Sequence, residues 1–116
     1  MPADASTLDL DTLLDDVRTF VDTELAPLDD TLRTDGFAAV EPKMTAVRNT
    51  ARANGWWCPQ LPEEHGGMGL SIADFGRLSE VLGRSPLGHL ALNCQAPDAG
   101  NMEILADHAT DAQRTR

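Results

Sequence analysis

The fold is decided by the glycine-rich stretch Pro62-Glu63-Glu64-His65-Gly66-Gly67-Met68-Gly69-Leu70. A glycine-rich loop that cradles a phosphate follows a strand and opens a helix. Here the residues on both sides have helical spacing, and no convincing strand precedes the loop. The stretch therefore predicts a turn between two helices rather than a nucleotide-binding loop.

Apolar residues recur at intervals of three and four near the start of the chain, which is the spacing of one helical face. They predict a first helix whose stripe contains Leu10, Leu13, Leu14, Val17, Phe20, Val21, Leu25 and Leu28. Pro27 lies within this pattern and lacks a backbone donor, so we expect a kink or break near Ala26. We expect the stripe to pack in a core, with binding to a partner as the alternative.

A second helix is expected after a linker over residues 34–39. Pro42 suits a first helical turn, and Gly55 suits a C-terminal stop. The helix should therefore run from about Glu41 to Asn54.

Later helices are indicated by residues that favour a helix start. These starts are Ser71 with Asp74, Ser85-Pro86, Pro97-Asp98 and Thr110-Asp111. The helix that Ser71 begins should end at Gly83, and the last one, too short to be stable alone, should fray from Asp111 onward. The sequence thus predicts an all-α fold of five to six helices.

Composition restricts the function classes. A chain of 116 residues is one domain at most, and no apolar run approaches the roughly 20 residues that span a bilayer. The formal net charge is −10, with eleven acidic residues among the first 41, which disfavours nucleic-acid binding because that needs Lys and Arg to neutralise phosphates. The N-terminus lacks a basic targeting start, so we expect a cytoplasmic protein without membrane or nucleic-acid partners.

The possible metal ligands are poorly spaced. They are Cys58, His65, His89, Cys94 and His108. No pair has the C-x-x-C or i, i+4 spacing that zinc sites use. We expect two free thiols and no metal site.

The order of these features resembles the N-terminal helical domain of the acyl-CoA dehydrogenases. The resemblance runs from Leu10 to Arg116 and depends on two motifs: the turn with its preceding Asn54-Gly55-Trp56-Trp57-Cys58-Pro59-Gln60-Leu61, and Gln95-Ala96-Pro97-Asp98-Ala99-Gly100-Asn101-Met102-Glu103. Either motif alone is weak, but the two in this order and spacing are fairly specific. The resemblance implies that residues 1–116 are this domain, truncated near the start of its last helix.

Family members dehydrogenate acyl-CoA thioesters at the α,β bond with FAD. The resemblance places the catalytic glutamate and most flavin contacts in domains that this chain lacks. We therefore expect no catalytic residue here, no tight binding of FAD, and an inactive chain on its own. The complete enzyme is expected to bind acyl-CoA and to form a homo-oligomer.

By position, the resemblance assigns one wall of the acyl pocket to Gln95, Ala96, Ala99 and Met102. Small residues would leave room for an acyl chain, and Met102 would give an adaptable lining. The alternative is that Ala and Met simply pack between helices.

Trp56 and Trp57 are adjacent, and adjacent side chains of an extended segment point in opposite directions. We expect one indole at the surface, with partial burial of both as the alternative. An exposed indole would suit a second candidate function, a non-enzymatic helical interaction module that associates with a partner subunit.

Overall fold

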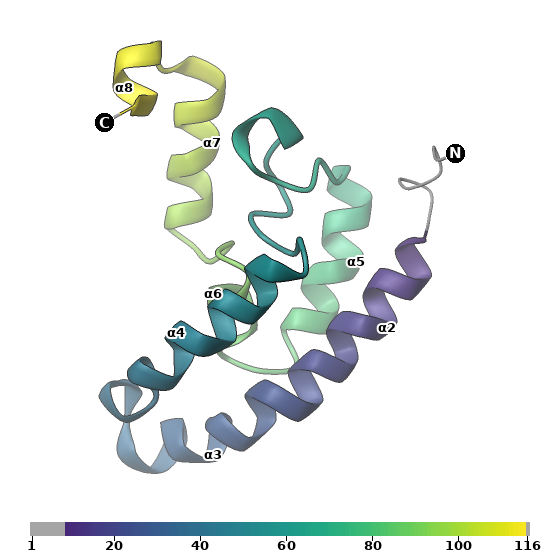
Figure 1. Ribbon diagram of the computed structural model, residues 1–116, viewed down its shortest axis with the longest axis vertical. Coiled ribbons are helices and arrows are strands. Elements are labelled where there is room, and N and C mark those ends of the chain that lie inside the picture. Colours follow the sequence, from purple (N-terminus) through teal and green to yellow (C-terminus); the bar gives the residue numbers. More distant parts are fainter. Residues whose placement is uncertain (1–8, 116) are drawn as a thin grey trace.

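The computed structural model describes residues 9–115, and all regular structure within them is helical. The elements in order are α2 (Leu10–Phe20), a π-helical turn (Val21–Leu25), α3 (Ala26–Asp35), α4 (Phe37–Ala53), a 3-10 turn (Glu63–His65), α5 (Ile72–Leu82), α6 (Gly88–Ala91), α7 (Asp98–His108) and α8 (Asp111–Thr115). Because α2, the π turn and α3 form one continuous rod, the described residues contain six α-helical segments (Figure 1). The all-α fold is confirmed.

A kink or break was predicted near Ala26, and the helix there is irregular but does not break. Val21–Leu25 is π-helical, and the Ala26 N–H bonds to the Val21 carbonyl. The rod then continues through Pro27, which has no donor of its own. This wider turn absorbs the effect of the proline without interrupting the helix.

The predicted linker over residues 34–39 and the predicted start of the second helix at Glu41 are wrong. α3 continues to Asp35, α4 begins at Phe37, and Gly36 alone makes the corner with φ of 89°. Pro42 therefore lies inside α4 rather than in its first turn. Its missing donor would have paired with the Ala38 carbonyl, and Ala38 is exposed, so water can bond there instead.

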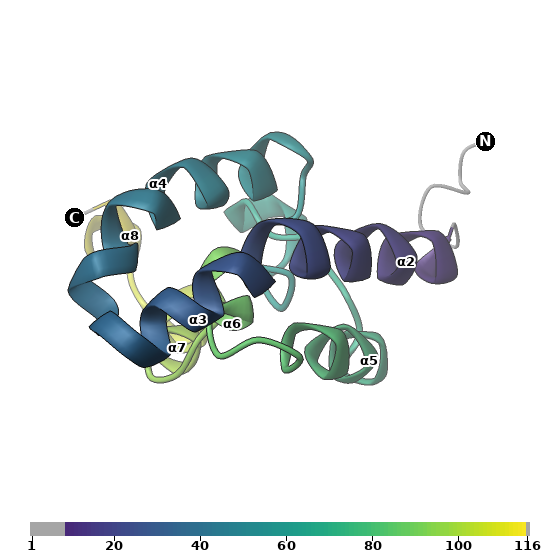
Figure 2. The same cartoon turned by 90° about the horizontal axis from the view of Figure 1, so that it is seen from below.

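The core forms where the apolar faces of the longer helices meet. α2 packs against α5, and α3 packs against α4, so the rod lies between these two helices (Figure 2). α6 contacts both α4 and α5 and closes the core. The fully buried centre contains Val17, Val21, Leu25, Val40, Leu78, Leu82 and Leu92.

The expected start of a helix at Ser85-Pro86 is wrong, because α6 begins at Gly88. Ser85 is buried and makes a turn instead: its hydroxyl donates to Asp29 Oδ1 at 2.6 Å and accepts the Leu87 N–H at 3.0 Å. These bonds tie the turn to α3. The other expected starts agree with the structure, and Ser71 caps α5 by accepting the Asp74 N–H at 3.1 Å.

The glycine-rich turn folds back on its own backbone. Gly66 and Gly69 have φ of 87° and 67°, which only glycine adopts easily. The Gly67 N–H donates to the Pro62 carbonyl at 3.0 Å, and the Gly69 N–H donates to the Leu61 carbonyl at 2.8 Å. The turn is thus a closed structural unit between α4 and α5, as the sequence predicted.

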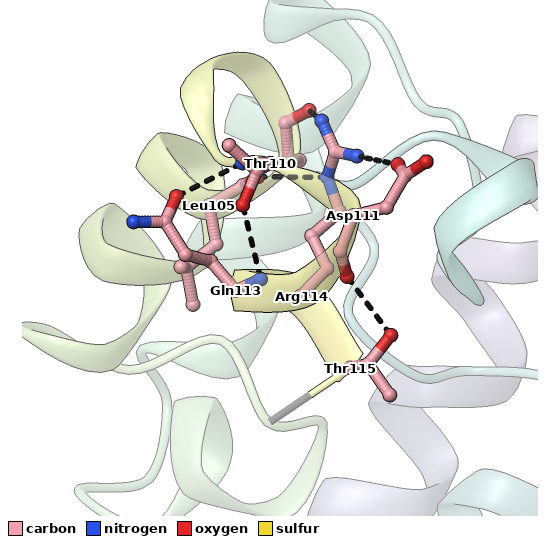
Figure 3. Close-up of polar contacts among 7 residues, drawn as sticks. Leu105, Thr110, Asp111, Gln113, Arg114 and Thr115 are labelled. Carbon is pink, nitrogen blue, oxygen red and sulfur yellow. Dashed lines mark hydrogen bonds and ion pairs between the residues drawn. The ribbon is translucent and has the colours of Figure 1, made fainter.

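α7 and α8 project beyond the other helices (Figure 1). No residue of either helix is buried, and α7 exposes 60% of Ile104 and 45% of Leu105. Arg114 holds α8 to α7, because its Nε donates to the Leu105 carbonyl at 3.0 Å and its Nη2 to the Ala106 carbonyl at 3.2 Å (Figure 3). Within α8, its Nη1 donates to Asp111 at 2.9 Å. Fraying from Asp111 stays a prediction.

Candidate functional site

The four predicted acyl-lining residues lie where the chain enters α7. Gln95 and Ala96 precede the helix, and Ala99 and Met102 lie in its first two turns. Ala99 and Met102 are spaced by three, which places them on one face of α7, and both are half-buried, as is Gln95 before the helix. Ala96 is exposed. The Ala99 N–H donates to the Gln95 carbonyl at 2.9 Å, which joins the entering segment to the helix.

Cys58 lies beside this segment, although the sequence indicated no role for it. Its Sγ is 3.9 Å from Met102 Sδ and accepts a hydrogen bond from Asn93 Nδ2 at 3.2 Å. Cys58 and Asn93 both have left-handed backbones, with φ of 49° and 59°. The Cys58 N–H donates to the Leu92 carbonyl at 2.9 Å, which joins the two segments again through the backbone.

Arg48 of α4 reaches the same place. Its Nη2 donates to Asn93 Oδ1 at 2.8 Å, and its guanidinium lies 5.1 Å from the centre of the Trp57 ring. Arg52, one turn later, lies 5.0 Å from the same ring. The indole therefore interacts with two cations, which stabilises both arginines without a carboxylate.

Trp56 and Trp57 are both half-buried, so the expectation of one surface indole is wrong and the alternative, partial burial of both, is confirmed. Trp56 packs edge-to-face on Phe20, with ring centres 5.5 Å apart at 74°. Trp57 is covered by the two guanidiniums. The chain turns sharply after them, with Cys58 in a left-handed conformation, so the alternation of an extended strand does not apply.

Burial changes the pKa of two groups near the site. Desolvation and the neighbouring Cys58 raise the pKa of the Cys94 thiol to about 12. Desolvation lowers the pKa of His89, whose Nε2 lies 2.6 Å from the Ser79 hydroxyl. Both cysteines are free, and the described residues contain no group of three His, Cys, Asp or Glu side chains that could hold a metal ion.

Residues 7–116 match the family model of the acyl-CoA dehydrogenase N-terminal domain. The chain belongs to the acyl-CoA dehydrogenase family. It is similar to mouse acyl-CoA dehydrogenase family member 10, with 33% identity over 84% of this chain and 10% of that protein. It is also similar to a Mycobacterium tuberculosis protein described as probable acyl-CoA dehydrogenase FadE2, with 37% identity over 65% of this chain and 18% of that protein.

A solved structure agrees with the family. A Mycobacterium abscessus protein assigned to the acyl-CoA dehydrogenases matches 93% of this chain with a TM-score of 0.82 and 31% identity. The match covers 30% of that protein, and this chain spans only about a tenth of the mouse relative. The fold of this acyl-CoA dehydrogenase domain is therefore shared with a much longer protein.

The glycine-rich turn of this acyl-CoA dehydrogenase domain does not fit the pyrophosphate of FAD. Such a cradle needs several backbone N–H groups that point outward. Here the N–H groups of His65, Gly66, Gly67, Gly69 and Leu70 all bond to carbonyls between Pro59 and Glu63. These N–H groups are therefore not free to bind a pyrophosphate.

A cavity of about 330 Å³ lies away from the predicted wall, between α2 and α5. It is lined by Leu14, Arg18, Arg77, Glu80, Val81 and Arg84. Each of its three arginines pairs with an aspartate of the α2–α3 rod, so the positive charges of these arginines are already compensated.

Among the described residues, no helix combines the length and apolarity needed to cross a bilayer.

Proposed function

We propose that residues 1–116 form the N-terminal helical domain of a FAD-dependent acyl-CoA dehydrogenase and supply one wall of its acyl pocket. In the complete homo-oligomeric enzyme, the substrate is an acyl-CoA thioester that is dehydrogenated at its α,β bond. The family match over residues 7–116 and the solved relative support this role. The domain contributes binding surface, and the reacting groups come from the rest of the enzyme.

The observation that carries the proposal is the half-buried face at the start of α7. Ala99 and Met102 share this face, and Gln95 is joined to it by the hydrogen bond from the Ala99 N–H to its carbonyl. A methyl side chain at Ala99 leaves space beside the flexible thioether of Met102, which suits an alkyl chain. The segment before the helix is fixed to α4 and to the turn at Cys58, so the wall is held in place.

A chimera tests the proposal. This chain replaces the matching segment of the Mycobacterium abscessus protein, and dehydrogenation of acyl-CoA thioesters is followed with a dye as electron acceptor. We expect turnover, and we expect Ala99→Phe to lower kcat/KM at least tenfold by filling the wall. Ala53→Phe, at an exposed position at the end of α4, is the matched control and should leave kcat/KM unchanged.

Two results would contradict the proposal. One is a folded, flavin-loaded chimera without turnover, and the other is an active chimera in which Ala99→Phe and Ala53→Phe behave alike. The isolated chain gives a separate check. After incubation with FAD and desalting, we expect no flavin absorption band.

The exposed face of α7 favours the second candidate, an interaction module without catalysis. Ile104 and Leu105 are large apolar side chains that a partner could cover. This role predicts a stable complex with the remaining segment of the relative, without turnover. Ile104→Asp should weaken such a complex, which sedimentation velocity measures.

A further inference from the structure

We propose that Arg48 is a positioning residue for the acyl-lining segment and that it acts on Met102 through Asn93 and Cys58. The inference rests on the proposed function, because it assumes that Met102 lines the acyl pocket. Arg48 lies on α4, and its hydrogen bond goes to Asn93 rather than to α7, so we argue its effect through the side chains between them.

The first link fixes Asn93. Arg48 Nη2 donates to Asn93 Oδ1 at 2.8 Å, which leaves the amide nitrogen of Asn93 pointing toward Cys58. A charged donor on the oxygen defines the orientation of the amide, since the opposite orientation would place two donors together. Arg48 therefore decides which group Asn93 offers to Cys58.

The second link fixes Cys58 and, through it, Met102. Asn93 Nδ2 donates to Cys58 Sγ at 3.2 Å, and this sulfur is 3.9 Å from Met102 Sδ. Asn93 and Cys58 both have left-handed backbones, which few residues other than glycine adopt without support. The hydrogen bond from Asn93 to Cys58, together with the bond from the Cys58 N–H to the Leu92 carbonyl, provides that support at the point where the chain leaves the core for α7.

Arg52 shows which interaction of Arg48 matters. Both arginines stack on Trp57 at the same distance, 5.1 and 5.0 Å, and neither forms an ion pair among the described residues. Only Arg48 also bonds to Asn93. Arg48 Nε is buried and has no hydrogen-bond partner among the described residues. The guanidinium is therefore oriented for the bond to Asn93 rather than for the bonding of all its N–H groups. Arg52 is thus a natural matched control.

The first experiment follows the methyl group of Met102 by NMR in the 116-residue chain labelled with 13C-methyl methionine. We expect Arg48→Gln to shift the Met102 resonance and to remove its contact with Cys58, whereas Arg52→Gln leaves both unchanged. The buried Met44 on α4 reports whether each variant keeps its core. Equal effects of Arg48→Gln and Arg52→Gln, or no effect of either, would overturn the proposal.

Two variants of Asn93 separate the links. Asn93→Gly keeps the left-handed backbone and deletes both hydrogen bonds, so it should reproduce the Met102 shift of Arg48→Gln. Asn93→Asp keeps an acceptor for Arg48 but removes the donor to Cys58, so Met102 should shift while the Trp57 environment stays as in the parent. If Asn93→Asp leaves Met102 in place, the path through Cys58 is wrong.

The chimera then connects position to binding. Because Arg48 acts on a wall and not on the reacting atoms, Arg48→Gln should raise KM for an acyl-CoA thioester about tenfold with little change in kcat, and Arg52→Gln should change neither. If Ala99→Phe lowers kcat/KM while Arg48→Gln has no effect, this inference fails and the proposed function stands. If Arg48→Gln shifts the Met102 resonance but Ala99→Phe leaves kcat/KM unchanged, the proposed function fails.

Discussion

Gly67 is the position at which one added methyl group should do the most damage to the turn between α4 and α5. A Cβ at this position would lie 2.6 Å from the Cys58 carbonyl oxygen and still closer to that of Leu61. Both obstacles are backbone atoms, so no side chain can rotate away, and the turn itself must open.

The cost follows from the hydrogen bonds at these two carbonyls and at Gly67 itself. The Leu61 N–H donates to the Cys58 carbonyl at 2.9 Å, and the Gly69 N–H donates to the Leu61 carbonyl at 2.8 Å. The Gly67 N–H donates to the Pro62 carbonyl at 3.0 Å. At a net value of about 1 kcal/mol each, their loss lowers the free energy of unfolding by about 3 kcal/mol. For a domain of this size, that corresponds to a fall in Tm on the order of 10–20 °C.

Urea unfolding followed by circular dichroism measures this effect in Gly67→Ala. The matched control is Gly76→Ala, because Gly76 lies inside α5 and a Cβ there meets no atom within 4 Å. The control should gain roughly 0.5–1 kcal/mol, since alanine is the better helix former. A Gly67→Ala variant within 0.5 kcal/mol of the parent would show that the turn is not closed as described.

Three further predictions concern single side chains. Burial holds the pKa of His89 below its ordinary value of 6.5, so unfolding takes up a proton and the free energy of unfolding should fall as the pH drops below 6.5. His89→Gln should flatten this pH dependence. An unchanged pH dependence would show that other groups cause it. Burial is the larger cause of the raised pKa of the Cys94 thiol and remains in a Cys58→Ser variant, so there Cys94 should react with a thiol reagent at pH 8 at least a hundredfold more slowly when folded than in urea; equal rates would show an accessible thiolate. Ser71→Ala removes the cap of α5 and should cost about 1 kcal/mol in urea unfolding, whereas Ser71→Asp should restore it; equal losses in both variants would exclude capping.

Local patterns predicted much of the fold. The apolar spacing of three and four identified the buried face of α2, and Ser71 and Gly55 lie at helix ends as expected. One error was the helix start expected at Ser85-Pro86. The others came from Pro27 and Pro42, which a local rule treats as a break or a start. In the structure, both prolines are accommodated because the packing of the rod and of α4 outweighs local preference.

The sequence predicted only those parts of the candidate site that belong to a recognisable motif. The stretch from Gln95 to Met102 resembles a family segment, so its position on α7 could be expected. The contacts of Arg48 with Asn93 and of Asn93 with Cys58 join residues 45 and 35 positions apart. No spacing rule covers such distances, and a left-handed cysteine or asparagine is not visible in the sequence.

The π turn gives the α2–α3 rod two different packing partners. A π turn holds one residue more than an α turn, so it changes the direction in which the second half of the rod faces. α2 faces α5, while α3 faces α4. If the same residues were wound as an unbroken α-helix, α3 would be rotated by about 100°, which would turn Leu28 away from the core. The π turn is thus as strict a requirement of the domain as the identity of its apolar residues.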